Sequence, residues 1–239
     1  MTGPPRGGLS PRAERMVSPR PRGRLEQRLR SPLIIGHRGF ASRYPDNSLA
    51  GVEAAIAAGA DGVEVDVRPC ADGTWMCHHD RSRAGTPVRE WDPEALHREG
   101  VPTLAEIAAA VPVGRWLFVE VKPLPAAELL AGEGTLIKLL RPRESNTRVI
   151  SSSEGVLATV HQALRGLALS LVFDEIPDPL PRGLELSPAH RLVAALLACG
   201  RPLHPWTVNH PERMRELARV GVASITTNDP ALAVEVLRG

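Results

Sequence analysis

The sequence predicts an α/β protein built as a (β/α)8 (TIM) barrel, and three observations support this prediction. Short apolar runs alternate with helical patterns from Ser31 onward, which implies a parallel sheet with crossover helices. The alternation yields eight strands within residues 31–239, near the lower size limit of such barrels. Polar side chains gather where these strands end. A doubly wound open sheet is the alternative, but no Gly-x-Gly-x-x-Gly follows the first strand.

The first half of the predicted barrel contains four strands, which are buried or alternating runs: Leu33–Gly36, Gly62–Val67, Thr74–Cys77 after an Asp-Gly turn, and Trp116–Val121. Two helices lie between them, each with polar N-cap residues: Ser48–Ala58 and Leu104–Ala110. The second helix has Thr103 and Glu106 at capping-box spacing. The stretch Arg81–Val101 is predicted to be irregular.

The second half contains four further strands: Arg148–Ser151, Leu169–Phe173, Leu203–Val208 and Ala223–Thr226. Its helices have apolar periodicity, and two of them are followed by glycine: Thr135–Leu140, Glu154–Leu164, Pro188–Cys199, Pro211–Val220 and Ala231–Leu237. Asp174–Pro188 is a second irregular stretch. Since there is neither an internal repeat nor a second domain, we expect a compact barrel over residues 31–239 without a large inserted domain.

The first 30 residues differ from the remainder in charge and composition. They contain eight arginines, no lysine and two acids, a charge of +6, so residues 31–239 carry −4 of the net +2. This Arg/Pro-rich leader lacks apolar periodicity and is predicted to be disordered. It also lacks the roughly 7–15 apolar residues of a secretory signal. Without aromatic residues among the arginines, we predict no nucleic-acid partner.

The remaining composition is that of an ordinary water-soluble protein. No apolar run approaches the roughly 20 residues that a membrane helix needs, so stable membrane insertion is not expected. Cys70, Cys77 and Cys199 form an odd set without metal-ligand spacing. Such a set is typical of reduced thiols in a cytoplasmic protein. The sequence leaves the oligomeric state open.

The second predicted strand has two carboxylates on one face. In the Val-Glu-Val-Asp-Val run at 63–67, strand alternation places Glu64 and Asp66 together, opposite the valines. Both faces of a parallel sheet are covered, so we expect these carboxylates to point into the barrel and repel each other. Glu120 and Lys122 show the same spacing on the fourth strand. Three oxygen donors suit a hard divalent cation, although protonation would also relieve the repulsion.

Two of the eight histidines stand within two residues of the end of a predicted strand and directly precede a charged residue. His37 stands before Arg38, and His79 stands before Asp80. Two imidazoles beside a bound substrate could serve as general base and general acid near neutral pH. We interpret the other histidines as structural residues.

Five sequence blocks occur at or near predicted strand ends: GHRGFASRYPDNS, GADGVEVDVRPCADGTWMCHHD, VEVKP, WTVN and ITTNDP. In this order they resemble the blocks of the glycerophosphodiester phosphodiesterase family, over roughly residues 33–237. The resemblance implies the hydrolysis of a small-molecule glycerophosphodiester to glycerol phosphate and an alcohol, a reaction of lipid and glycerol metabolism. A glycerol hydroxyl would attack phosphorus first, and water would open the cyclic product.

The resemblance also implies a role for each candidate residue. His37 and His79 would be the acid–base pair. The metal ligands would be Glu64, Asp66 and Glu120, which would hold Mg²⁺ or Ca²⁺ as a Lewis acid. The cations that bind the phosphate would be Arg38 and Lys122. Trp206 and Asn209 are candidates for the substrate pocket.

This sequence departs from the family pattern at several positions, including Asp46 in place of Glu and Asn228 in place of Asp. The connection after His79 is short, so we expect an open cleft and broad tolerance of the alcohol. None of the departures removes a catalytic group.

Two other functions stay open at this point. One is a lysophospholipase D or sphingomyelinase D-like activity on the same barrel, which should require an apolar channel. The low aromatic content of 3% is mild evidence against such a channel. A catalytically silent, ligand-binding relative would usually have lost a metal ligand or a histidine, and none is missing here.

Overall fold

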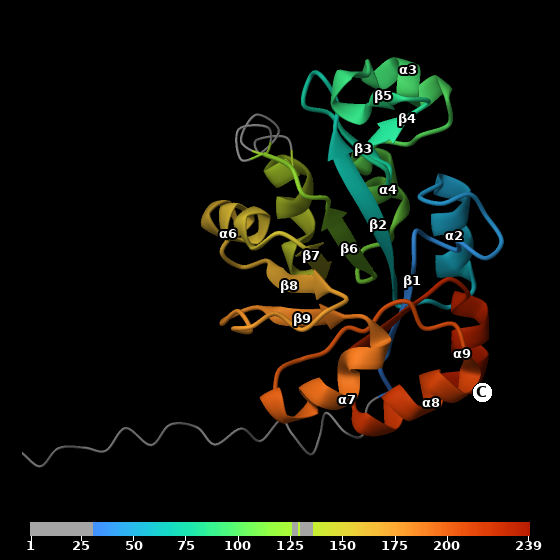
Figure 1. The fold of residues 1–239 in the computed structure, drawn as a ribbon. Helices are drawn as coiled ribbons and strands as arrows, with labels where there is room; N and C mark the ends of the chain where they lie inside the picture. Colours follow the sequence, from blue (N-terminus) through green and yellow to red (C-terminus); the bar gives the residue numbers. More distant parts are fainter. Residues whose placement is uncertain (1–30, 126–128, 130–135) are drawn as a thin grey trace, which may run out of the picture.

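The computed structural model describes residues 31–125, 129 and 136–239, and it shows parallel strands curled into a barrel with helices outside (Figure 1). The predicted disorder of residues 1–30 lies outside the described residues. Within the described part, seven strands form the parallel sheet: β1 (Leu33–Gly36), β2 (Gly62–Pro69), β6 (Trp116–Val121), β7 (Thr147–Ser151), β8 (Ala168–Phe173), β9 (Glu185–Pro188) and β10 (Ser224–Thr227). Their order is β10-β1-β2-β6-β7-β8-β9.

Residues 203–208 lie between β9 and β10 in the wall of the barrel, in the position of its eighth strand. The N–H of His204 donates to the Leu186 carbonyl at 2.7 Å, and the N–H of Val208 donates to the Thr226 carbonyl at 2.9 Å. The segment was predicted to be a strand, but it makes only isolated bridges, one with Leu186 of β9 and one with Ala189, the residue after β9. Pro205 has no N–H, which helps explain why a regular ladder does not form. The predicted (β/α)8 fold is confirmed.

Four helices begin and end much as the sequence predicts: α2 (Leu49–Ala57), α4 (Leu104–Ala110), α6 (Glu154–Ala163) and α8 (Pro211–Val220). The last helix, α9 (Pro230–Arg238), also agrees, and residues 136–140 are helical. Two further helices in the described chain, α3 (Pro93–Arg98) and α7 (Val193–Leu196), differ from the prediction. The predicted capping box of Thr103 and Glu106 is present. Gly221 ends α8 with a left-handed φ of 79°. None of these helices has the length and apolar content needed to cross a membrane.

One strand prediction was wrong in topology, and one strand was not predicted. Thr74–Cys77 does contain a strand, β3 (Trp75–Cys77), but it runs antiparallel to β2 and is not a barrel strand. The turn between β2 and β3 is too short for the crossover of a dozen or more residues that a parallel pair needs. The strand β9 lies at the end of Asp174–Pro188, which was predicted to be irregular.

The stretch Arg81–Val101 is also not irregular, and we call it the insert. It contains a hairpin of β4 (Ser82–Arg83) and β5 (Thr86–Pro87), the 3-10 turn η1 (Val88–Glu90) and α3. It stands beyond the end of β2, at the top of Figure 1. A small apolar cluster holds it there: Cys70, Met76, Val88, Leu96 and Val101.

The predicted helix Pro188–Cys199 begins later and is broken. Pro188 ends β9, and the chain then passes through η3 (His190–Leu192), α7 and η4 (Leu197–Cys199). A further 3-10 segment, η2 (Arg141–Asn146), precedes β7.

The core has an outer and an inner part. Valines of the 63–67 run belong to the main apolar cluster with residues of α2 and α4. Inside the barrel a separate cluster contains Ile35, Phe118, Ile150 and Val172. The alternation of β2 therefore turns Glu64 and Asp66 inward, as predicted.

Candidate active site

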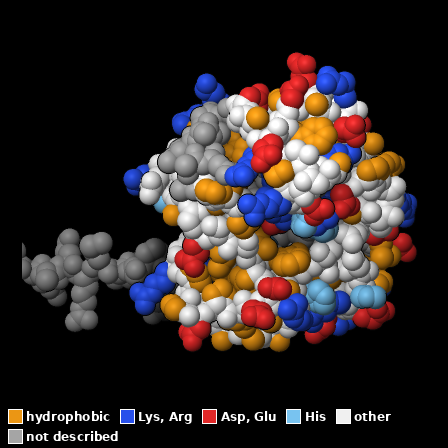
Figure 2. All heavy atoms as spheres, turned by 45° about the horizontal axis from the view of Figure 1, so that its top comes forward, with side chains coloured by type: hydrophobic (Ala, Val, Ile, Leu, Met, Phe, Trp, Pro, Cys, Tyr) orange, Lys and Arg blue, Asp and Glu red, His pale blue; other side chains and the backbone are white. Residues whose placement is uncertain are grey.

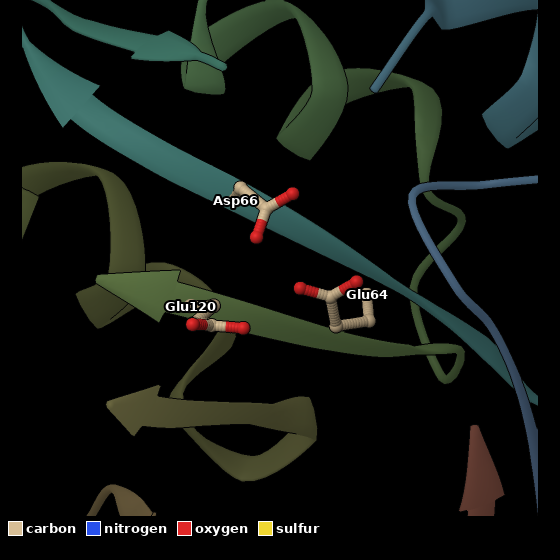
Figure 3. A group of neighbouring side chains, drawn as sticks. All are labelled: Glu64, Asp66 and Glu120. Atoms are coloured by element: carbon tan, nitrogen blue, oxygen red, sulfur yellow. The ribbon is translucent and has the colours of Figure 1, made fainter. Parts of the chain in front are cut away.

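Three carboxylates from two neighbouring strands meet at the carboxyl end of the barrel. Glu64 and Asp66 project from β2 and Glu120 projects from β6, all toward one another (Figure 3). One oxygen of each lies within 4.8 Å of the others. Asp66 pairs with Glu120 in the parallel register of the two strands. Glu64 and Asp66 are 2% and 0% exposed, so both residues are almost completely buried.

Two cations contact this carboxylate cluster. The Lys122 Nζ lies 2.7 Å from the Asp66 Oδ1 and 2.6 Å from the Glu120 Oε1. The Arg38 Nε lies 3.0 Å from the Asp66 Oδ2. Glu64 receives only the backbone N–H of Arg38, at 3.1 Å, and its Oε1 has no hydrogen-bond partner among the described residues.

The unequal partners give the three carboxyl groups different proton affinities. Burial, together with repulsion from Asp66 and Glu120, raises the pKa of Glu64 well above its usual value. Burial also raises the pKa of Glu120, and Lys122 offsets part of this effect. At Asp66 burial is outweighed by the charges of Lys122 and Arg38, so the pKa of Asp66 is lowered.

Asn47 holds Asp66 in place, a role that the sequence analysis missed. Its Nδ2 donates to the Asp66 Oδ2 and its Oδ1 accepts from the Asp66 N–H, both at 3.0 Å. The Asn47 backbone is left-handed, with φ of 60°, a conformation that asparagine tolerates better than most residues. An asparagine in the turn before α2 was the available signal, but the sequence analysis treated the polar residues of this turn only as N-cap residues.

The turn after β1 brings Arg38 to the cluster. A Cβ on Gly36 would lie 2.2 Å from the Gly39 carbonyl oxygen, so this turn requires glycine. Arg38 itself has a φ of 50°, a strained conformation for a residue with a side chain. Its carbonyl accepts from the Asn47 N–H at 3.0 Å, and its Nη1 lies 2.5 Å from the Asp46 Oδ2. The predicted phosphate ligand is therefore held between two carboxylates.

His37 is oriented by Asn228, a residue near the other end of the chain. Its Nδ1 lies 2.6 Å from the Asn228 Oδ1, and its Nε2 lies 3.9 Å from the Glu64 Oε2. An amide oxygen only accepts hydrogen bonds, so with Asn228 in this orientation Nδ1 carries the proton and Nε2 is the free acceptor. Burial lowers the pKa of His37, which favours the neutral imidazole.

His79 follows β3 and stands at the rim of the site. Its side chain is 43% exposed, and its Nδ1 lies 2.9 Å from the Asp80 Oδ1. The antiparallel β3 returns the chain to the end of β2, which is how a strand outside the barrel ladder delivers this histidine.

A cavity of about 270 Å³ brings most of the predicted residues together. Its polar wall contains His37, Arg38, Glu64, His79, Glu120 and Lys122. Its apolar wall contains residues that the sequence analysis did not select as site residues, Phe118, Ile150 and Val172, together with the predicted Trp206. Asp66 and Asn209 do not line it. Asn209 instead accepts from the Asn228 N–H at 2.9 Å, and so supports the residue that orients His37.

The residues present fit a hard divalent cation. The donors are all carboxylate oxygens, which Mg²⁺ and Ca²⁺ prefer, and the unpartnered Glu64 oxygen is a buried acceptor without a donor. With all three acids ionised and both cations charged, the cluster carries a net charge of −1. A dication together with a phosphodiester would bring that charge to zero.

Comparison with known proteins identifies the family. The model of the glycerophosphoryl diester phosphodiesterase family matches residues 37–140 and 135–232. A glycerophosphodiester phosphodiesterase of Caldanaerobacter subterraneus subsp. tengcongensis is 28% identical, over 86% of this chain and 98% of the relative. A probable glycerophosphodiester phosphodiesterase 2 of Mycobacterium tuberculosis is 27% identical, over 86% of this chain and 90% of the relative.

Solved structures agree on the fold. The glycerophosphodiester phosphodiesterase of Thermotoga maritima has a TM-score of 0.73 at 22% identity, covering 87% of this chain and 99% of that one. An Oleispira antarctica phosphodiesterase in complex with the product sn-glycerol-3-phosphate has a TM-score of 0.76 at 18% identity, covering 87% and 98%. Because the family model spans most of the sequence, this chain belongs to the glycerophosphoryl diester phosphodiesterase family.

Proposed function

We propose that this chain hydrolyses glycerophosphodiesters to glycerol phosphate and an alcohol, with a divalent cation held by Glu64, Asp66 and Glu120. The observation that carries the proposal is the single cavity in which ligand oxygens, two cations and two histidines meet. Family membership and the substrate class named for the relatives support it.

The two histidines have different surroundings, which suggests different tasks. His37 is buried, its Nδ1 is bonded to Asn228, and its Nε2 faces the cluster. We assign it as the base that takes the proton of the attacking glycerol hydroxyl. His79 stands at the solvent-exposed rim, where a leaving alcohol can depart. We assign it as the acid that protonates the leaving oxygen.

The remaining polar groups bind and orient the substrate. Arg38 and Lys122 would exchange part of their contact with the carboxylates for the phosphodiester oxygens. When bound, a divalent ion would supply Lewis-acid stabilisation of the phosphate charge. The apolar wall of Phe118, Ile150 and Val172 limits the water that reaches this part of the cavity.

The test is a release assay with glycerophosphocholine, glycerophosphoinositol and glycerophosphoglycerol, with Mg²⁺ or Ca²⁺ and with a chelator. We expect glycerol phosphate to appear with metal and to disappear when the metal is chelated. Unchanged turnover after chelation and dialysis would contradict the metal assignment, and no turnover of any diester would contradict the function.

A deoxy analogue lacking the glycerol hydroxyl next to the phosphoester tests the route of attack. If that hydroxyl is the nucleophile, the analogue should be inert. Cleavage of the analogue at a comparable rate would mean that water attacks phosphorus directly.

We also propose that the reaction takes place in the cytoplasm. Support comes from the cysteines, since Cys70, Cys77 and Cys199 are all unpaired and two of them are buried. Unpaired cysteines are typical of a reducing compartment.

A further inference from the structure

A second cavity of about 520 Å³ lies between the insert and the rim of the barrel. Its walls are basic and apolar: Arg68, Pro69, Arg81, Pro87, Val88, Arg89, Lys122, Pro123, Leu124 and Pro125. Among the described residues that line it there is no carboxylate. We call this cavity the basic groove. On the face turned forward in Figure 2, Lys and Arg side chains lie beside apolar ones near the middle of the molecule.

The basic groove adjoins the catalytic cavity at two points. Lys122 lines both cavities. The Arg68 Nε donates to the His79 carbonyl oxygen at 3.0 Å, so the guanidinium lies directly beside the residue that we assign as the acid. The groove thus begins where the bond to the alcohol would break.

The sizes of the two cavities suggest how a substrate divides between them. The catalytic cavity is the smaller one and is lined by two of the three metal-ligand candidates, Glu64 and Glu120, so it suits the constant half, glycerol phosphate. The alcohol would pass His79 and enter the basic groove, whose residues Arg81 and Arg89 are exposed to solvent.

Part of the positive charge of the groove has no carboxylate partner. Lys122 and Arg89 pair with carboxylates that do not line the groove, but Arg81 makes no ion pair with any described residue. The guanidinium groups of Arg68 and Arg81 are both charged at neutral pH. Two neighbouring guanidinium groups can bind the oxygens of a phosphate by several charge-assisted hydrogen bonds.

We propose that the basic groove binds the alcohol half of the substrate and selects alcohols that carry an additional phosphate group. This inference rests on the proposed function and adds the preference for the leaving alcohol. It replaces the broad tolerance expected from the sequence, because the connection after His79 forms one wall of a groove instead of leaving the cleft open.

The experiment compares two substrates that differ by one phosphate, glycerophosphoinositol and glycerophosphoinositol 4-phosphate. The free Mg²⁺ concentration is held constant, since the added phosphate also binds the metal. We expect kcat/KM to be about tenfold higher for the phosphorylated substrate, corresponding to about 1.4 kcal/mol. Glycerophosphocholine, with its cationic alcohol, should be the poorest of the three.

Arg81→Glu should abolish this preference, because it places a negative charge in the groove. Arg98→Glu is the matched control: it makes the same change of charge, on the same insert, at an exposed residue that does not line the groove. Arg98→Glu should keep the wild-type ratio of the two kcat/KM values. The ratio is measured within one protein preparation, so partial loss of folded protein does not affect it.

The outcomes separate the two proposals. Turnover of glycerophosphoinositol without a preference for its 4-phosphate overturns this inference and leaves the proposed function standing. An equal fall of the ratio in Arg81→Glu and Arg98→Glu also overturns it, because the effect would then come from net charge. If the protein hydrolysed none of the diesters, both the proposed function and this inference would be wrong.

Discussion

The two ends of the barrel interior both contain buried charged residues, but they use them differently. At the end opposite the mouth, Arg148 forms an ion pair with Glu185, and its guanidinium lies over the Trp116 and Phe118 rings. The His204 Nε2 lies 2.7 Å from the Glu185 Oε2, and His204 also lines the catalytic cavity, so this ring lies between the two ends. At the mouth, three carboxylates face two cations and one carboxylate oxygen has no donor.

The opposite end is electrically balanced. Burial lowers the pKa of His204 to about 4, so the ring is neutral at neutral pH. A carboxylate only accepts, so Nε2 must donate to Glu185, and Nδ1 then accepts from the Ser224 hydroxyl at 2.7 Å. One guanidinium and one carboxylate sum to zero. This network requires no ligand, whereas the mouth gains from a cation.

Glu64→Gln should have the largest effect on the reaction. Replacing a ligand oxygen by an amide group removes a charge from the metal site, so we expect metal-dependent turnover to be abolished. The measurement is glycerol phosphate release at saturating Mg²⁺ and at saturating Ca²⁺. Near wild-type activity in either metal would show that Glu64 is not a ligand.

Glu185→Gln makes the same substitution at the other end of the barrel and serves as the control. The molecules that fold should retain activity, because Glu185 lines neither cavity and contacts the catalytic one only through His204. If both variants lost activity equally, the distinction between the two ends would be wrong.

Arg148→Met should be the most destabilising change at the opposite end. It leaves Glu185 without its guanidinium partner. Because the Glu185 side chain is 33% exposed and keeps its contact with His204, we expect a smaller loss than the ~3–5 kcal/mol typical of a fully buried ion pair. Denaturant unfolding should show this loss with kcat retained below the transition. The double variant Arg148→Met/Glu185→Gln should recover part of the stability, and a loss in the double variant as large as in the single one would contradict the balanced-pair interpretation.

His37→Ala and His79→Ala should each reduce the rate at least about a hundredfold, equivalent to about 2.7 kcal/mol. Substrate affinity should change far less, because neither histidine is assigned to phosphate binding. Single-turnover rates and substrate binding measured separately would distinguish the two effects. Full activity in either variant would remove that histidine from the mechanism.

The sequence predicted those features of the site that depend on neighbouring residues. The pairing of Glu64 with Asp66 follows from strand alternation alone. The place of His37 follows from the end of an apolar strand. These patterns are local, so no knowledge of the folded chain was needed.

Contacts between distant residues were not predictable in the same way. Asn228 reaches His37 across 191 residues, and Asn47 reaches Asp66 across 19. The strand β9 has the sequence Glu-Leu-Ser-Pro, which carries little strand signal, and only its pairing with β8 makes it a strand. Such roles appear only when the barrel closes.

The smallest effect that we predict concerns stability without metal, and it tests the charge imbalance at the mouth directly. Folding raises the pKa of Glu64 above its ordinary value of 4.5, so between these two values the folded protein holds a proton that the unfolded chain has released. Its stability therefore falls as pH rises through that window. Glu64→Gln lacks this proton, so with chelator present we expect it to be as stable as wild type near pH 4.5. Its advantage in melting temperature should then grow as the pH rises above 4.5.

The difference between the two proteins is the quantity to measure, because His204 titrates in both. Its lowered pKa makes stability rise with pH from about 4 to 6.5 in each protein, and this contribution cancels in the comparison. Adding Mg²⁺ should raise the melting temperature of wild type and leave that of Glu64→Gln unchanged. If the chelated variant were less stable than wild type at pH 8, the Glu64 carboxylate would be a stabilising group. The cluster would then be a structural ion-pair network that needs no cation, as at the opposite end of the barrel.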